Sequence, residues 1–367
     1  MKQTGAMPLP NAKFANALLR WYDAAKIFLP WRGGRDPYHI WLSEIMLQQT
    51  RVAAVKEYYS RWLEKFPTIE KLATASLDEV LKAWEGLGYY TRARNVHKLA
   101  KIIVNDHQGQ FPNTAEALQT LPGIGRYTAA AIASITFDER VAVLDGNVIR
   151  ILSRLLDLPD EINQPKVQTK LWNVAESRLP KNRCGDYNQA IMDLGRTICT
   201  PRNPNCGECP VQKFCEAYKN KTTHLRPVKK AKASIPKIHA AAAVIRDKQQ
   251  RILLVQRKLD GLLGGLWMLP QTNCEADENY QTCLQRNFQK DFGTEIFVGE
   301  EMTHATQTFT HFHLTLCAFA CEIHQGKLKS KLKMKWVARA EMSKYSFGKA
   351  DRAIIDALEN WQPRLFT

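Results

Sequence analysis

The sequence has few acidic residues for its length and no long hydrophobic run. Its 367 residues contain 36 Asp and Glu against 52 Lys and Arg, a formal net charge of +16. This balance, with 45% hydrophobic residues, excludes an acidic disordered chain. No apolar stretch reaches the roughly 20 residues that a membrane-spanning helix needs. The first residues, MKQTGAMPLPNAKF, lack the hydrophobic segment of a signal peptide. We therefore expect a soluble intracellular protein whose positive charge favours a nucleic acid partner.

The nine cysteines are too unevenly spaced for a disulfide framework. Four of them are separated by six, two and five residues, namely Cys199, Cys206, Cys209 and Cys215. The other five show no such grouping. In an intracellular chain this cluster indicates a metal site. Four thiolates in one loop can hold either zinc or a four-iron cluster, and the spacing alone does not choose between them.

The chain changes character near residue 216, from a helical part to a mixed part. Helical periodicity predicts helices over residues 38–66, 77–84, 91–106, 114–120, 126–137 and 147–156. Between Glu216 and Asp247 the sequence has eight basic residues and no acidic one, which predicts an extended linker. Beyond it, strand-like runs begin at His239, Arg251 and Phe312, with a helix over residues 280–291 between them. We therefore predict an all-helical domain followed by a smaller α+β domain.

The segment LPGIG, residues 121–125, predicts a hairpin between two helices. Gly123 and Gly125 permit a tight turn whose backbone N–H groups point outward, directly before the N-terminus of a helix. Such a turn binds phosphate through peptide dipoles and does not read the bases. An ordinary helix–helix corner has the same pattern. The basic charge of the chain favours a contact with the DNA backbone.

Two acidic residues stand in unusual surroundings. Glu44, in IWLSEIMLQQT, shares one helical face with Ile40 and Leu47, so its carboxyl group is directed toward apolar neighbours. Burial raises the pKa of a carboxyl group, which suits a general acid at neutral pH. Asp145 follows the run VAVL directly before a predicted helix. It can serve as an N-cap or as a carboxylate that faces a developing cation.

Several short motifs follow one another along the first 220 residues. The hairpin LPGIG, the run VAVLDGNV and the cysteine spacing together resemble the endonuclease III superfamily of helix-hairpin-helix DNA glycosylases. Four further stretches, LPWR, WLSEIMLQQT, GLGYYTRARN and YNQAIMDLG, resemble its adenine DNA glycosylase branch, the MutY family. The resemblance covers nearly all of residues 14–220. It implies a DNA repair hydrolase of the bacterial cytoplasm, associated with the nucleoid and monomeric. Its partner would be double-stranded DNA in which adenine is mispaired with 8-oxoguanine or guanine.

The resemblance also implies an architecture. A glycosylase domain at 1–224 would hold a six-helix barrel at about 29–137 and a cluster subdomain from 1–28 and 138–224. A basic linker at 225–236 and a Nudix-like lesion-recognition domain at 237–367 would follow. The four clustered cysteines would bind a [4Fe–4S] cluster.

The resemblance implies roles for single residues as well. The target base lies too deep in the duplex for chemistry, so it must be flipped into a pocket. There Glu44 would protonate the adenine ring and Asp145 would stabilise the oxocarbenium-like sugar. Tyr127 and Asn147 would support them at the same centre. The residues implied in DNA and base binding are Trp31, Arg32, Leu47, Gln49, Thr50, Leu87, Tyr89, Gly123, Gly125, Phe309, Thr310 and His311.

Some of these contacts are implied in more detail. Gln49 and Tyr89 would enter the base stack, and Thr50 and Leu87 would contact the lesion opposite adenine. The stretch QTFTHFHL resembles the lesion-sensing loop of the family. Serine is more familiar where Thr310 stands, so this chain keeps the hydroxyl group and adds a methyl group.

Tyr127 separates two kinds of enzyme. In the bifunctional endonuclease III branch, a lysine at this position forms a Schiff base with the sugar, which a phenol cannot do. We therefore expect a monofunctional glycosylase. One alternative is an endonuclease III-like enzyme for oxidised pyrimidines, which Tyr127 and the second domain oppose. Another is a non-catalytic DNA-binding protein, which has no need of both Glu44 and Asp145.

The second domain resembles Nudix pyrophosphohydrolases but keeps few of their metal ligands. Alignment on Arg286 and Gly293 keeps Glu278 and places Asp291 at an acidic position. The other signature positions hold Thr272, Asn287 and Lys290. A magnesium site built from carboxylates would lose most of its ligands there. We expect recognition of DNA rather than hydrolysis.

Overall fold

The computed structural model describes residues 11–25, 27–230, 234–275 and 278–358. Contacts between Cα atoms divide the chain into two units, residues 1–74 with 95–232 and residues 75–94 with 233–367. Residues 75–94 therefore pack with the C-terminal part of the chain, although helical sequence surrounds them on both sides. The domain boundaries drawn from the sequence stay a prediction.

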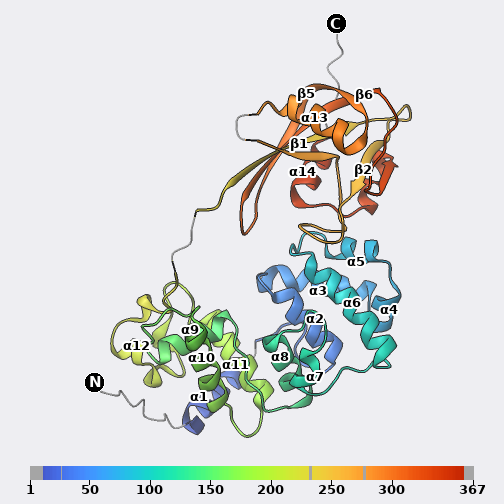
Figure 1. Ribbon diagram of the computed structural model, residues 1–367. Coiled ribbons are helices and arrows are strands. Elements are labelled where there is room, and N and C mark those ends of the chain that lie inside the picture. Colours follow the sequence, from blue (N-terminus) through green and yellow to red (C-terminus); the bar gives the residue numbers. More distant parts are fainter. Residues whose placement is uncertain (1–10, 26, 231–233, 276–277, 359–367) are drawn as a thin grey trace. The chain divides into compact units, whose positions relative to one another are not determined.

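The first unit is built from helices (Figure 1). They are α1 Asn11–Ala25, α2 Pro37–Leu47, α3 Val52–Lys65, α4 Ile69–Thr74, α6 Thr91–Asp106, α7 Ala115–Gln119, α8 Arg126–Phe137, α9 Gly146–Leu155, α10 Pro165–Ser177, α11 Cys184–Thr197 and α12 Glu216–Lys219, with 3₁₀ turns η1 Cys206–Glu208, η2 Gln212–Phe214 and η3 Thr223–Leu225. The first four residues of α6 belong to the other unit.

The helix predicted over residues 38–66 is in fact two helices. Residues 48–51 form a turn between α2 and α3, and Gln49 has a φ of 57° there. A left-handed residue cannot continue a right-handed helix, and a hydrophobic period does not reveal it. The break places Gln49 and Thr50 on a loop rather than on a helix.

Helix α8 lies at the centre of the first unit. Its residues from Thr128 to Thr136 are all buried, and α2, α7 and α11 pack against it. A helix that is buried on every side, here with mostly alanine and isoleucine, must be surrounded by other elements. This position fixes its first turn, which carries Tyr127, against the neighbouring helices.

The second unit contains two sheets. One has the strand order β4-β1-β6-β5 and the other β3-β2-β7. The elements are α5 Leu77–Trp84, β1 Lys237–Ile245, β2 Ile252–Gln256, β3 Trp267–Met268, β4 Gln271–Cys274, α13 Tyr280–Phe292, β5 Glu295–Thr308, β6 His313–Gln325, β7 Met334–Val337, η4 Arg339–Lys344 and α14 Lys349–Ala357. The three predicted strands and the predicted helix are confirmed as β1, β2, β6 and α13.

Strands β5 and β6 form one long hairpin (Figure 1). Strand β6 also pairs in parallel with β1, from Lys237 opposite His313 to Ile245 opposite Cys321, so β1 supports the hairpin from beside its tip along most of β6. Apolar residues on the two faces of this sheet form separate cores, one packed with α13 and the other with α14. The tip, residues 309–312, carries the predicted lesion-sensing residues.

Helix α5 is tied to the C-terminal part of its unit. Glu85, directly after the helix, accepts hydrogen bonds on Oε1 from the Phe347 amide at 3.0 Å and from Arg352 Nη2 at 2.9 Å. Tyr90 donates to the Phe347 carbonyl oxygen at 3.3 Å. These bonds fix both ends of the short loop that carries Leu87 and Tyr89.

The cysteines outside the cluster are not all unpaired. Cys274 at the end of β4 and Cys283 on α13 form a disulfide, with their Cα atoms 5.8 Å apart. The uneven spacing spoke only against a disulfide framework, and this single pair was not predicted. The spacing of nine residues gave no sign of it, because the fold of the sheet and helix brings the two residues together.

The ends of the predicted basic linker are anchored. Near its start, the Ile162 amide donates to the Val228 carbonyl oxygen at 3.1 Å. At its end, the His313 amide donates to the Pro236 carbonyl oxygen at 2.9 Å. Residues 231–233 between these contacts lie outside the described residues.

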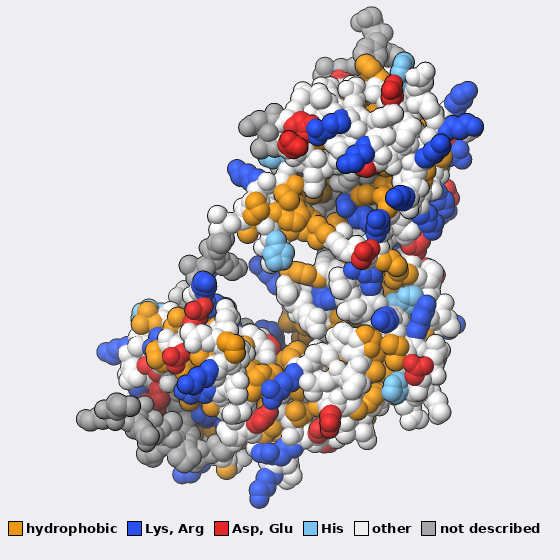
Figure 2. All heavy atoms as spheres, viewed as in Figure 1, with side chains coloured by type: hydrophobic (Ala, Val, Ile, Leu, Met, Phe, Trp, Pro, Cys, Tyr) orange, Lys and Arg blue, Asp and Glu red, His pale blue; other side chains and the backbone are white. Residues whose placement is uncertain are grey.

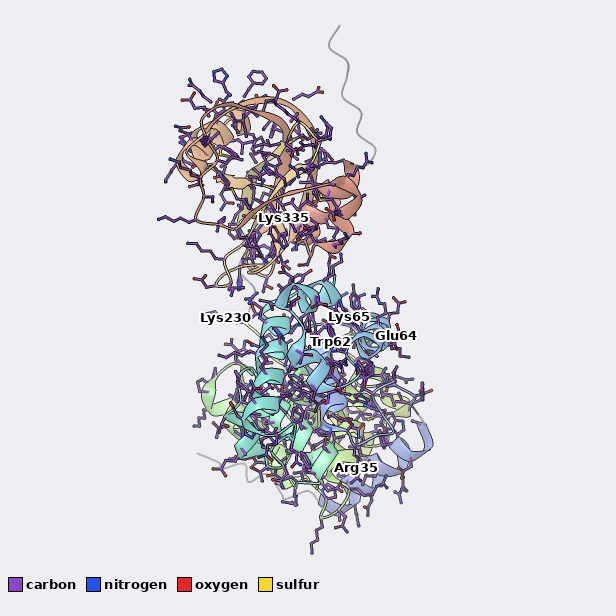
Figure 3. The ribbon with its side chains drawn as sticks, turned by 90° about the vertical axis from the view of Figure 1, so that its right-hand side faces the viewer. Arg35, Trp62, Glu64, Lys65, Lys230 and Lys335 are labelled. Carbon is purple, nitrogen blue, oxygen red and sulfur yellow. A yellow bond between two sulfur atoms is a disulfide. The ribbon has the colours of Figure 1, made fainter. Side chains whose placement is uncertain are left out.

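Basic side chains are spread over the surface of both units (Figure 2). Alternate lysines from Lys327 to Lys335 are exposed, and Lys335 is labelled in Figure 3. The alternate residues Leu328, Leu332 and Met334 pack against the sheet core. In the described part of the chain, no helix combines the length and apolar character needed to cross a membrane.

Candidate active site and cluster loop

A cavity of about 870 Å³ in the first unit collects most of the predicted catalytic and DNA-binding residues. It is lined by the turn before α2, by α2 and its following loop, and by parts of α8, α9 and α11. The predicted residues that line it are Trp31, Arg32, Glu44, Leu47, Gln49, Thr50, Tyr127, Asp145 and Asn147. Its size is typical of a small-molecule site. A ligand of small-molecule size therefore has room in it.

Glu44 is buried in the wall of this cavity, with 6% of its surface exposed. Tyr127 donates a hydrogen bond from its hydroxyl group to Glu44 Oε2 at 2.6 Å. Burial raises the pKa of Glu44 to about 7; Asp145 raises it as well, while the Tyr127 hydrogen bond and Arg32 lower it. The carboxyl group is therefore protonated in a large fraction of molecules near neutral pH. It can deliver a proton to a bound base.

Tyr127 serves as a fixed hydrogen-bond donor. Its hydroxyl group also lies 3.1 Å from Met192 Sδ. Burial and the neighbouring Glu44 carboxylate hold the pKa of the phenol well above its ordinary value. The phenol stays protonated at neutral pH, so it orients Glu44 rather than competing with it for a proton.

Asp145 caps helix α9 and lines the cavity. Its Oδ1 accepts hydrogen bonds from the Asn147 amide at 2.8 Å and the Val148 amide at 2.7 Å, and Asn147 Nδ2 donates to Oδ2 at 2.8 Å. Burial raises the pKa of Asp145, and these hydrogen bonds oppose the rise. The N-cap and the cavity carboxylate are therefore one group, held rigidly by the start of the helix.

The hairpin lies outside the cavity lining. Gly123 has a φ of 81°, and a Cβ atom there would lie 2.9 Å from Asn95 Cβ. Gly125 stands at the N-cap of α8 with no side-chain cap, and a Cβ atom would meet nothing within 4 Å. The turn therefore requires glycine at position 123, whereas Gly125 leaves the N-terminus of α8 open to an anion.

Sequence reasoning missed one face of α11. Gln189, Met192, Asp193 and Arg196 all line the cavity. They recur at the spacing i, i+3, i+4 and i+7, which places them on one side of a helix. Asp193 is 2% exposed and accepts hydrogen bonds from both Nη atoms of Arg32, the one from Nη2 at 3.1 Å. The recurrence of Gln189, Asp193 and Arg196 on one side of α11 is the signal that could have revealed this face.

Short turns gather the four clustered cysteines. Cys199 follows α11, Cys206 and Cys209 bracket η1, and Cys215 follows η2. Burial raises the pKa values of the Cys206, Cys209 and Cys215 thiols, and the charges of the neighbouring cluster cysteines raise them further. The four sulfur atoms therefore share one electrostatic neighbourhood. Among the described residues, no group of three His, Cys, Asp or Glu side chains is arranged to hold a single metal ion.

A buried arginine tests which group fits this loop. Arg154 is 2% exposed, and its Nη1 donates to Cys199 Sγ at 3.2 Å and to the Thr200 carbonyl oxygen at 2.8 Å. Its Nε donates to the Thr223 carbonyl oxygen at 3.0 Å. A buried guanidinium group needs a negative charge nearby. An anionic iron–sulfur cluster held by four thiolates supplies it, so the donor set fits such a cluster.

Another arginine connects the loop to the cavity. Arg150 Nε donates to the Cys199 carbonyl oxygen at 2.8 Å, and its Nη2 donates to Asn147 Oδ1 at 2.9 Å. The start of α9, which holds Asp145, is thereby tied to the first cysteine of the cluster.

The remaining predicted residues lie in the second unit. Tyr89 is 47% exposed with a φ of 49°, and its hydroxyl group lies 3.2 Å from Thr310 Oγ1. The rings of Phe309 and Phe312 stack with centroids 4.6 Å apart. Leu87 is buried in the same unit, and His311 at the tip is exposed. The unit thus brings Tyr89 to the tip of the β5–β6 hairpin.

Three family models match the chain. Residues 42–177 match the HhH-GPD superfamily base excision DNA repair protein model, residues 199–215 the iron-sulfur binding domain of endonuclease III, and residues 241–357 a NUDIX domain. They confirm the predicted fold class, a helix-hairpin-helix domain followed by a Nudix-like domain. They also confirm the cofactor, a [4Fe–4S] cluster.

Known proteins resemble the chain over most of its length. The adenine DNA glycosylase of Mus musculus is 37% identical over 85% of this chain and 71% of that protein. The adenine DNA glycosylase of Buchnera aphidicola subsp. Schizaphis graminum is 41% identical over 65% of this chain and 69% of that protein. A thermostable thymine-DNA glycosylase of known structure superposes with a TM-score of 0.53 and 31% identity, covering 57% of this chain and 97% of that one.

Proposed function

This chain belongs to the adenine DNA glycosylase family of base-excision repair, and from that premise we propose that it hydrolyses the N-glycosidic bond of adenine paired with 8-oxoguanine or guanine. We propose that it acts as a monomer and does not cut the strand. The observation that carries the proposal is the hydrogen bond from Tyr127 to Glu44 beside Asp145 in one cavity. The cavity therefore brings a proton donor, Glu44, and an anion, Asp145, to the place where a flipped base would enter.

The two carboxyl groups divide the reaction between them. Protonated Glu44 transfers its proton to the adenine ring, so that adenine leaves as a neutral molecule. The sugar develops positive charge as the bond breaks, and ionised Asp145 stabilises it. A water molecule then adds to C1′ of the sugar and loses a proton to solvent, so the products are free adenine and an abasic site. Asn147 holds the Asp145 carboxylate in place. Because the reaction needs protonated Glu44 and ionised Asp145, excision should be fastest between the pKa values of the two groups.

The same cavity supports a monofunctional reaction. Tyr127 occupies the position from which a lysine would attack the sugar, and its phenol cannot form an imine. One lysine, Lys229, does line the cavity, but it is exposed.

A set of duplexes tests this proposed function. We expect single-turnover release of adenine opposite 8-oxoguanine and guanine, and much slower release opposite thymine. Strand breaks should appear only after alkali. Equal breakage without alkali would overturn the monofunctional reaction, and a Lys229→Ala variant would then show whether that amine is responsible. Activity on oxidised pyrimidines and none on adenine would favour the endonuclease III-like alternative.

We propose that Thr310 reads the base opposite adenine. 8-Oxoguanine differs from guanine by an N7 proton and an O8 atom, and a hydroxyl group can report on one hydrogen bond. Such a bond is worth about 1 kcal/mol. We therefore expect Thr310→Ala to reduce the preference for 8-oxoguanine over guanine several-fold, measured as the ratio of single-turnover rates with enzyme in excess of duplex but below saturation.

Two variants control this measurement. Thr310→Ser keeps the hydroxyl group and should keep the preference. Thr306→Ala makes the same change at an exposed position on β5 before the tip, and should leave the ratio unaltered. A full preference in Thr310→Ala would assign lesion reading to Thr50, Leu87 and their neighbours instead.

We propose that Cys199, Cys206, Cys209 and Cys215 hold the cluster and that it supports DNA docking rather than bond cleavage. Anaerobically purified protein should contain about four iron atoms per chain. Cys209→Ser should lower the iron content and weaken duplex binding about tenfold or more, because the loop presents basic side chains to phosphates. Cys184→Ser, which changes a buried free cysteine elsewhere in the unit, is the control. Stoichiometric zinc without iron would contradict the assignment.

A further inference from the structure

Among the described residues that line the cavity, Asp193 on α11 is the buried carboxylate that the proposed reaction does not use. It is 2% exposed and accepts hydrogen bonds from two arginines. Arg32, from the turn before α2, contacts it with both Nη atoms. Arg196, one helical turn away on α11, donates from Nη2 to Asp193 Oδ1 at 3.1 Å. The Tyr22 ring lies beneath the Arg32 guanidinium group, 5.8 Å from it.

These three side chains form a charged wall of the cavity. Arg32, Asp193 and Arg196 all line it, and together they carry one net positive charge. Because Arg32 is mostly buried, with 13% of its side chain exposed, its charge is only weakly screened by water.

Glu44 is surrounded by groups from several elements, and Arg32 of the charged wall is one of them. Tyr127 faces Glu44 from α8 and Asp145 from the start of α9, and Arg32 acts on it from the turn before α2. Arg51 and Arg150 also line the cavity. Arg32 is the cation whose charge opposes protonation of Glu44, and Asp193 is its direct partner.

We propose that Asp193 is a positioning residue for the acid: it holds Arg32 in one place and offsets part of the positive charge that Arg32 presents to Glu44. The inference rests on the proposed function, in which Glu44 is the proton donor. Arg32 stays available to hold an incoming base or phosphate, while enough negative charge remains nearby for Glu44 to keep its proton near neutral pH.

The neutral, nearly isosteric variant Asp193→Asn removes this offset. The wall then carries two net positive charges, which favour the ionised form of Glu44. One unpaired charge nearby shifts the pKa of a carboxyl group by about one unit or more. In single-turnover excision at saturating enzyme, the alkaline limb of the rate–pH profile should move down by about one pH unit. Above pH 8 the protonated fraction of Glu44 falls tenfold when its pKa falls by one unit, so the variant should excise about tenfold more slowly there. Below pH 6 its rate should be nearly unchanged.

Arg32 provides a test of the opposite sign. Arg32→Gln removes the cation, so its alkaline limb should move to higher pH even where substrate binding is weakened. Asp193→Glu keeps the charge and should restore the native limb. Opposite shifts from two partners of one ion pair are the mark of an electrostatic role, because loss of packing would slow the reaction at every pH.

A matched control comes from an ion pair outside the cavity. Asp138 pairs with Arg35, which is labelled in Figure 3, and both side chains are more than half exposed. Asp138→Asn makes the same chemical change and should leave the profile unaltered. Thermal unfolding of each variant followed by circular dichroism shows whether it folds. If Asp193→Asn does not fold, Arg32→Gln and Asp193→Glu decide the question.

The outcomes separate this inference from the proposed function. A native protein that does not excise adenine contradicts the proposed function itself. A native protein that excises adenine, together with alkaline limbs that stay in place in Asp193→Asn and Arg32→Gln, overturns the role of Asp193 alone. Downward and upward shifts in the two variants support it.

Discussion

Replacing Glu44 by glutamine should slow adenine excision roughly a thousandfold while leaving mismatch binding almost intact. A positioned general acid contributes about 10²- to 10⁴-fold to a rate. Glutamine has nearly the same shape and can still accept the Tyr127 hydrogen bond, but it has no proton to transfer. Binding depends mainly on phosphate contacts, so it should survive. The measurements are single-turnover excision at saturating enzyme and equilibrium binding to the same duplex.

A glutamate on α3 gives the control for this variant. Glu64 is exposed and is labelled in Figure 3. Glu64→Gln changes the net charge by the same amount and should excise at the native rate. Native excision in Glu44→Gln would remove this residue from the mechanism.

The same variant should become more stable than the native protein as the pH rises. The pKa of Glu44 is about 7 in the folded protein against an ordinary value of 4.5, so folding favours the protonated form. The stability that this provides is fully present below pH 4.5 and is lost as the pH rises through 7. Glutamine does not ionise. The difference in unfolding free energy between Glu44→Gln and native protein should therefore grow by up to about 3 kcal/mol from pH 4 to pH 8.

Chemical unfolding at several pH values measures this difference. A constant difference from pH 4 to pH 8 would show that Glu44 ionises without cost in the folded protein. Its burial would then not explain its role as an acid. Native enzymes often keep such a destabilising group where activity needs it.

Replacing Asp145 by asparagine should slow excision by a similar factor without unfolding α9. Groups that stabilise charge in a transition state contribute about 10²- to 10³-fold. Asparagine loses the negative charge that faces the sugar. It remains a good N-cap, because its side-chain oxygen can accept the Asn147 and Val148 amide hydrogens. The unfolding free energy should therefore change by less than about 1 kcal/mol. Single-turnover excision and thermal unfolding measure the two effects.

Asp36 provides a control at another N-cap. It caps α2 through the Tyr38 amide at 2.7 Å and the His39 amide at 3.3 Å, as Asp145 caps α9. Asp36→Asn makes the same exchange outside the cavity lining and should leave excision at its native rate. If Asp145→Asn keeps full excision, the residue is an N-cap alone.

The sequence alone determined the features whose causes are local. The hairpin turn depends on Gly123, whose backbone conformation only glycine adopts without strain. Helical spacing was enough to predict that Glu44 points into apolar surroundings. The position of Asp145 directly before a predicted helix was enough to predict that it can cap that helix. The cysteine spacing indicated a metal site, although the resemblance to a family was needed to choose iron. In each case the residues that matter lie within about 16 positions of one another.

Only the tertiary structure decided which distant residues meet. Arg32 and Asp193 are 161 positions apart, and no periodicity predicts that they pair. The disulfide between Cys274 and Cys283 requires the sheet and helix that bring its ends together. Residues 75–94 have helical sequence like their neighbours, yet their contacts place Tyr89 beside Thr310. Local patterns follow from the geometry of one helix or turn, whereas these pairs depend on the packing of whole elements, which single-residue spacing does not encode.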